Sequence, residues 1–262
     1  MGIYMLREYD WLCFTANSAG STVKIVQAWY PTAVTLETST DWSTRTTYTI
    51  WNTITLTNIG DNVFFRNTST TDTWFSTSTG NKYVFRFTWS VAGSWDVCYL
   101  LNKNSTTTLS NYCFYWLFES DSELTSAPKI SATTYWQYSC GLMFQGSGIV
   151  TAPSILATTL DQQCCYRMFM NCKSLEELPA LPALALKYYC YWEMFEACTK
   201  IKISQTQTWE YQTPYRIPTE WTWTYTNATY DMYLMFYNTW WTFKSPTNPN
   251  INTTYYTSNT VV

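Results

Sequence analysis

Residues 160–175 read LDQQCCYRMFMNCKSL, and residues 186–201 read LKYYCYWEMFEACTKI. In the first stretch apolar residues recur at intervals of four, with a phenylalanine beside the third: Leu160, Cys164, Met168, Cys172 and Phe169. The second stretch repeats this pattern with Leu186, Cys190, Met194, Cys198 and Phe195. Residues four positions apart lie on one face of an α-helix. The spacing therefore predicts a helix in each stretch.

The same unit recurs upstream at a fixed period. Each copy contains a phenylalanine preceded by Leu or Met, and these phenylalanines are 26, 25 and 26 residues apart: Phe118, Phe144, Phe169 and Phe195. A period of this length is typical of repeat proteins, in which stacked units share one continuous core. We therefore predict a solenoid whose core contains Phe118, Phe144, Phe169, Phe195, Met143, Met168, Met194, Leu160 and Leu186.

A proline precedes each expected helix. Pro128, Pro153 and Pro179 recur at distances of 25 and 26 residues. Because a proline is not tolerated inside the helix that follows, each one is expected to end a short extended segment. The unit is then a short strand followed by a helix, which predicts an α/β solenoid over residues 111–205.

Residues 1–110 carry a strand pattern instead. Short β-branched and aromatic runs alternate with turn signals, for example at residues 19–20 and 60–62. In residues 83–89 every second residue is aromatic, which is the period of a strand with one face on a core. This spacing predicts an Ig-like β-sandwich, with strands at residues 21–28, 33–39, 46–51, 53–57, 62–66, 83–89 and 95–101.

The composition of the 262-residue chain excludes several classes of function. There is no histidine, so the usual general base near neutral pH and the commonest transition-metal ligand are missing. A formal net charge of -3 argues against a nucleic-acid partner, and no apolar run predicts insertion into a membrane. With 46% hydrophobic and 13% charged residues, the chain is expected to form a core.

Cysteines and carboxylates do not form a recognisable reactive site. Four of the nine cysteines fall on the predicted inward face and are expected to be reduced core residues. Cys164 and Cys165 are adjacent, unlike a zinc-binding Cys-x-x-Cys pair. Glu176 and Glu177 are adjacent in an extended stretch and would point to opposite faces. We therefore predict no metal, no cofactor and no catalytic residue.

Four stretches of the repeat region resemble the BspA-like leucine-rich repeat family, found in surface proteins of gut bacteria and in their tailed phages: residues 124–128, 157–160, 166–175 and 181–183. The resemblance covers roughly residues 113–201, and the N-terminal region resembles the β-domain that precedes such repeats. Gly146-Ser147-Gly148 departs from the Gly-Cys-Thr of that family, and Cys140 and Cys165 stand where it usually has tyrosine. The resemblance implies a leucine-rich repeat solenoid in a surface protein.

Residues 206–262 form an aromatic-rich C-terminal region. Residues 221–225 alternate between aromatic residues and threonine, which predicts a strand with one aromatic face. Two interpretations are open: a cap over the end of the solenoid, or a surface that binds a glycan or a protein through rigid rings. This candidate binding surface consists of Trp209, Trp221, Trp223, Tyr225, Trp240 and Trp241.

These features together predict a non-enzymatic adhesion protein. The β-domain begins about ten residues after Met1 with no leader before it. We therefore expect a phage virion surface protein, such as a capsid decoration, head fibre or tail-associated protein, anchored by residues 1–110. The expected partners are other virion proteins, further copies in a homo-oligomer, and a host-surface glycan or protein. The alternatives are a bacterial cell-surface adhesin and, less favoured, an accessory module of a carbohydrate-active enzyme.

Overall fold

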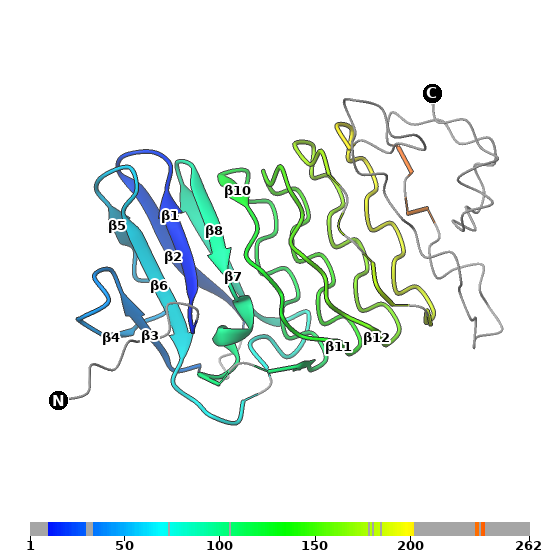
Figure 1. The fold of residues 1–262 in the computed structure, drawn as a ribbon, viewed down its shortest axis with the longest axis horizontal. Helices are drawn as coiled ribbons and strands as arrows, with labels where there is room; N and C mark the ends of the chain where they lie inside the picture. The colour runs from blue at the N-terminus through cyan, green and yellow to red at the C-terminus, as the bar shows by residue number, and fades with distance from the viewer. Residues whose placement is uncertain are drawn as a thin grey trace.

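The computed structural model describes residues 10–29, 34–72, 74–104, 106–177, 179, 181–183, 185–201, 234–235 and 237–238. Two β-sheets lie at one end of the molecule, and a row of stacked coils continues from them along the long axis (Figure 1). Within the described residues there is no α-helix, and the single helical element is a 3-10 helix, η1 (Val97–Leu100). The predicted α/β leucine-rich repeat solenoid is therefore wrong, for a reason that the repeat geometry supplies below.

Three sheets contain the strands. The six-stranded sheet has the order β10-β8-β1-β6-β3-β4, with β10 (Leu124–Ser126), β8 (Val91–Trp95), β1 (Leu12–Ala16), β6 (Asn62–Asn67), β3 (Leu36–Ser39) and β4 (Thr46–Tyr48). A three-stranded sheet has the order β5-β2-β7, with β5 (Ile54–Leu56), β2 (Ser21–Trp29) and β7 (Asn81–Thr88). The third is parallel and belongs to the coils, with β12 (Thr159–Leu160), β11 (Thr134–Tyr135) and β9 (Thr108–Leu109).

The first two sheets pack face to face, and we call them, with their loops, the N-terminal sandwich (residues 10–104). Alternate residues of β1 and β7 point into the space between the sheets, as the period of two requires. There the Phe14 ring lies 4.9 Å from the rings of both Phe85 and Phe87. Aromatic pairs at this separation add to the stability that burial supplies. Phenylalanine rings from both sheets therefore pack together in the core of the sandwich, among aliphatic side chains such as Val23 and Ile25.

In six of the seven predicted segments a strand occupies at least three residues. The seventh, residues 95–101, holds only the last residue of β8 before the chain turns into η1. Asp96 causes this change, because its carboxylate accepts the Cys98 N–H at 3.0 Å and caps the 3-10 helix. The sequence analysis also did not predict strands at the positions of β1 and β8.

The coils contain a chain of turns where helices were predicted. In residues 112–120, 138–146, 163–171 and 189–197, every fourth residue has a positive φ, between 51° and 67°. We call each of these segments a turn ribbon. Within a ribbon every second N–H donates three residues back, as from Met168 to the Cys165 carbonyl at 3.2 Å. The intervening N–H groups donate to the next coil, as from Phe169 to the Met194 carbonyl at 2.9 Å.

The period of four explains the failure of the helix prediction. An α-helix advances by about 100° per residue, so Leu160 and Cys172 would differ by about 120° around its axis. A strict repeat of four thus leaves the face of a helix within three steps. In the turn ribbon four residues make one complete unit, and residues four apart keep the same direction. Cys164 and Met168 in the ribbon are consequently both buried, and Leu160 before it and Cys172 after it continue the same buried row.

The coils stack in parallel and share one column of phenylalanine rings. We number them from the start of each strand as the first (residues 108–133), second (134–158), third (159–184) and fourth coil (185–201). Neighbouring rings are stacked with centroids 5.3, 5.6 and 5.4 Å apart along the series Phe118, Phe144, Phe169 and Phe195. The structure buries every residue of the predicted repeat core, with at most 4% of any residue exposed.

The N-terminal sandwich closes the open side of the first coil. Ribbon carbonyls that would accept from a preceding coil accept here from the sandwich: Leu117 from the Phe85 N–H at 2.8 Å, and Cys113 from the Ser76 N–H at 2.9 Å. Strand β10 extends the six-stranded sheet by pairing with β8. The Phe118 ring lies 5.4 Å from that of Phe85, so sandwich and coils share one continuous core.

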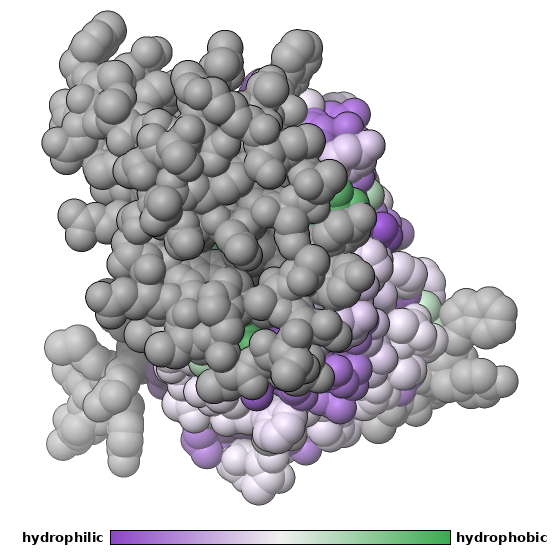
Figure 2. Space-filling view, turned by 90° about the vertical axis from the view of Figure 1, so that its right-hand side faces the viewer, coloured by the Kyte–Doolittle hydropathy of each residue, from purple (hydrophilic) through white to green (hydrophobic). Residues whose placement is uncertain are grey.

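The far end continues the ribbon pattern beyond the fourth coil. The Phe195 N–H donates to the Met235 carbonyl at 2.9 Å, and the Ala197 N–H donates to the Tyr237 carbonyl at 2.8 Å. Leu234 and Asn238, four residues apart, again have positive φ. Seen from this end, the visible described surface is mainly hydrophilic or neutral, and its hydrophobic spots are small (Figure 2).

Removal of one ring from the phenylalanine column is the first test of this fold. Phe169→Ala is expected to lower the free energy of unfolding by about 3 to 5 kcal/mol, because it leaves a cavity between two stacked rings. Leu156→Ala is the control, since Leu156 lies in the same solenoid but is 40% exposed. Urea denaturation measures both. A loss below about 1 kcal/mol for Phe169→Ala would contradict the stacked core.

Asp121 supplies a pH-dependent test of the contact between sandwich and first coil. Its buried carboxylate accepts the Phe87 N–H at 3.0 Å, and burial raises the pKa of this carboxyl from 3.8 to about 6. Because the folded state has the higher pKa, the contribution of Asp121 to stability is complete below pH 3.8 and lost as the pH rises through about 6.

We therefore expect the unfolding free energy of the wild type to fall, relative to Asp121→Asn, by on the order of 1 kcal/mol between about pH 5 and about pH 7. Denaturant titrations of both proteins at the two pH values measure this difference. Parallel pH profiles for the two proteins would show that Asp121 does not titrate in the buried position described.

Candidate binding site

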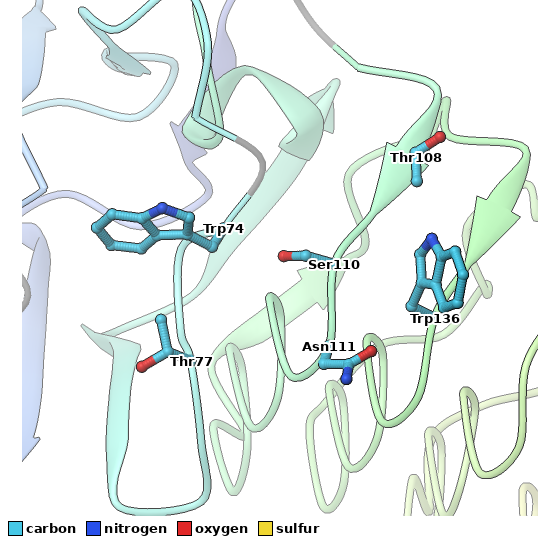
Figure 3. A pocket seen from close by; sticks show the side chains of 6 residues that line it. All are labelled: Trp74, Thr77, Thr108, Ser110, Asn111 and Trp136. Carbon is cyan, nitrogen blue, oxygen red and sulfur yellow. The ribbon is translucent and has the colours of Figure 1, made fainter.

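A pocket of about 460 Å³ lies where the N-terminal sandwich meets the first two coils. Its described lining consists of Trp74, Thr77, Thr108, Ser110, Asn111 and Trp136. Figure 3 shows Trp74 and Trp136 on opposite sides of Ser110 and Asn111. This volume falls within the range of about 300–1,000 Å³ that is usual for small-molecule sites.

The sandwich side of the pocket is held by the two residues between Trp74 and Thr77. Phe75 is fully buried, and its ring lies 5.0 Å from that of Tyr83. Ser76 is also buried and donates its N–H to the Cys113 carbonyl of the first coil. The backbone that follows Trp74 is therefore anchored both to the sandwich, through Phe75, and to the first coil, through Ser76.

The coil side is held by the stacking of the first two coils. Thr108 lies in β9, and the next residue, Leu109, is buried. Asn111 precedes Tyr112, which has a φ of 60° and donates its N–H to the second coil. Trp136 donates its N–H to the Leu109 carbonyl at 3.1 Å, while 49% of the residue is exposed. A fixed backbone thus presents an exposed indole ring.

The lining combines aromatic rings with neutral hydrogen-bonding groups. Hydroxyls of Thr77, Thr108 and Ser110 donate and accept, and the Asn111 amide does both. Sugars carry the complementary features, because one face of a pyranose ring presents C–H groups and its edge presents hydroxyls. Tryptophan supplies a large flat surface for the former. The arrangement fits a neutral sugar.

The lining carries no group suited to catalysis. Among its described residues there is no carboxylate, thiol, amine or guanidinium. General acid–base catalysis by a side chain requires a group that can exchange a proton near the working pH. The described lining therefore offers aromatic surface and neutral hydrogen-bonding groups to a ligand.

The predicted binding surface at the C-terminus cannot be compared with this pocket. Trp209, Trp221, Trp223, Tyr225, Trp240 and Trp241 lie outside the described residues. Sequence reasoning missed the pocket because its residues are far apart in the chain. One signal was present: Trp136 stands at the repeat position that Ser110 and Asp161 occupy in the neighbouring coils. A large aromatic residue at an outward, variable repeat position indicates a contact made outside the core.

The cysteines are structural in the described arrangement. All nine are free and buried. Two of them donate their thiol hydrogens to carbonyls of the preceding coil, Cys172 to Phe144 at 2.9 Å and Cys198 to Phe169 at 3.0 Å. Burial raises the pKa of Cys172 to about 12. A thiol that stays protonated is a poor nucleophile and a poor metal ligand.

Carboxylates do not gather into a site either. Asp41 accepts hydrogen bonds from the backbone N–H and the hydroxyl of Thr44, and these lower the pKa of its carboxyl to about 2. The described residues hold no group of three or more His, Cys, Asp or Glu side chains placed to bind a metal ion. In the same part of the chain, no helix has the length and apolar character that a bilayer span needs.

Comparison with known proteins gives no relative. No protein-family model, no curated protein and no solved structure matches this chain.

Thiol accessibility tests the role of the cysteines. We expect none of the nine thiols to react with iodoacetamide in the native protein, and all nine to react after unfolding in guanidinium chloride. Mass spectrometry of the alkylated chain counts the modified residues. Rapid native labelling of Cys172 or Cys198, or an intact disulfide between Cys164 and Cys190, would contradict the buried, reduced arrangement.

Proposed function

We propose that the protein is a non-enzymatic adhesion module that binds a neutral glycan in the pocket between Trp74 and Trp136. The observation that carries the proposal is the described lining, in which two tryptophans surround hydroxyl and amide groups and none of the described residues carries a charge. Ligand sites of this kind are mostly apolar and contain a few placed polar groups that fix orientation. The described lining supports adhesion to a glycan through contacts of this kind.

The rigidity of the pocket supports this proposal. Each wall is tied to an adjacent element by backbone hydrogen bonds, at Ser76 on the sandwich side and at Trp136 on the coil side. A preformed site loses little conformational entropy when a ligand binds. Tryptophan adds contact area at low entropic cost. Both features lower the entropic cost of binding. This suits a glycan that binds each site weakly and is presented in many copies on a surface.

We propose further that the module is displayed on a virion surface as a homo-oligomer, with a bacterial cell surface as the alternative. This part rests on the resemblance of the repeats to surface proteins of bacteria and their phages. Copurification with virus particles would support the first location, and copurification with cell envelopes would support the second.

Trp136→Ala is the direct test of the pocket. On a glycan array, we expect the wild type to bind neutral glycans and Trp136→Ala to lose at least about tenfold in affinity, as an aromatic hot spot does when truncated. Because Trp136 is 49% exposed, the variant should keep its stability. Trp89→Ala is the control, since Trp89 is 65% exposed and does not line the pocket.

The opposite outcomes are also informative. If Trp136→Ala binds glycans as well as Trp89→Ala does, the pocket is not the binding site. A double variant Trp221→Ala with Trp223→Ala then tests the C-terminal aromatic surface that the sequence predicted. Binding of proteins but of no glycan would overturn the sugar assignment.

A further inference from the structure

We propose that the neutral glycan is a linear polysaccharide that leaves the pocket and crosses the coils along a row of threonines. This inference rests on the proposed glycan-binding function of the pocket. The row consists of Thr108, which lines the pocket, followed by Thr134 and Thr159. We call these three residues the threonine row.

Strand pairing places the three side chains on one face. Thr134 pairs in register with Thr108 on one side and with Thr159 on the other, in parallel strands. Residues paired in this way point to the same side of a sheet, and their neighbours in sequence point to the other side. The neighbours Leu109, Tyr135 and Leu160 are buried. The threonine row therefore faces outward.

A second set of threonines lies immediately before the three strands. Thr107, Thr133 and Thr158 each precede a residue of the threonine row in the sequence, and none of them is buried. Their backbones are joined across the coils, since the Thr133 N–H donates to the Thr107 carbonyl at 2.9 Å and the Thr158 N–H donates to the Thr133 carbonyl at 3.0 Å. The hydroxyls thus lie on a regular, fixed backbone.

The spacing of the coils suits an extended sugar chain. Adjacent strands in a sheet are about 4.7 to 4.9 Å apart, which is close to the length of one pyranose residue in an extended polysaccharide. Successive sugar residues can therefore meet equivalent hydroxyls on successive coils. A row that starts in a pocket and runs across the coils favours a linear chain over a branched or compact glycan.

The length of the threonine row and a charge beside it restrict the kind of polysaccharide that can bind. In the fourth coil the repeat position of Thr159 is occupied by Ala185, so the row ends after three hydroxyls. Asp161 lies two residues beyond Thr159, and its N–H donates to the Tyr135 carbonyl at 2.8 Å, which fixes it beside the row. Its carboxylate repels an anionic polymer. The row therefore fits a neutral polysaccharide.

The test uses neutral oligosaccharides of increasing length, from disaccharide to octasaccharide, prepared from cellulose, β-1,3-glucan and mannan. Isothermal titration calorimetry with the full chain measures each affinity. We expect the affinity for one of these series to rise with length until the threonine row is covered, and then to level off. The double variant Thr134→Val with Thr159→Val should lose about tenfold in affinity for the long members, because two hydrogen bonds are removed.

The shortest members of the series and a control variant separate this inference from the pocket itself. The threonine double variant should bind the disaccharide as the wild type does, whereas Trp136→Ala should lose both short and long members. Thr47→Val makes the same change on the exposed strand β4 and should change neither.

Two results would overturn the inference. If affinity does not depend on length while Trp136→Ala still loses binding, the threonine row takes no part and the pocket remains the whole site. If no series binds and Trp136→Ala changes nothing on the glycan array, the proposed function fails together with the row.

Discussion

The alternating hydrogen bonds of the turn ribbon are the interaction on which the rest of the structure depends. Half of the N–H groups close turns within a coil, and the other half join it to the next coil. This pattern requires a positive φ at every fourth residue, and Gly146 is the one glycine among those positions in the first four ribbons. Apart from Asn171, whose residue type tolerates this conformation, each of the other residues is strained by roughly 1 kcal/mol or more. Burial of the phenylalanine column offsets that strain.

The ribbon also explains where the pocket lies. A coil needs a partner for its backbone on both sides, and the first coil finds one in the N-terminal sandwich, through contacts such as that between Phe85 and Leu117. The regular stacking of the coils changes at this contact. Trp74 from the sandwich and Trp136 from the second coil line the resulting pocket on opposite sides. The pocket is therefore a consequence of joining two different architectures.

Parts of this structure could be predicted from the sequence, because burial follows simple periods. The period of two identified most strands of the sandwich, and the 25- or 26-residue period identified the column that includes Phe144 and Phe169. Counting apolar residues led to the wrong prediction of helices, because four-residue spacing is compatible with one or two helical turns. Only the persistence of this spacing as far as Cys172 distinguishes a turn ribbon from a helix. The pocket depends on contacts between distant segments, which no local pattern contains.

Replacement of Ala197 by glycine tests the turn ribbon most directly. Ala197 has a φ of 56°, so Ala197→Gly relieves strain and the account predicts that the unfolding free energy is unchanged or rises, by up to about 1 kcal/mol. In an α-helix the same substitution lowers stability by about 1 kcal/mol. Ala157→Gly is the control, because buried Ala157 has no positive φ and should lose stability. A loss of about 1 kcal/mol at Ala197 as well would contradict the turn ribbon.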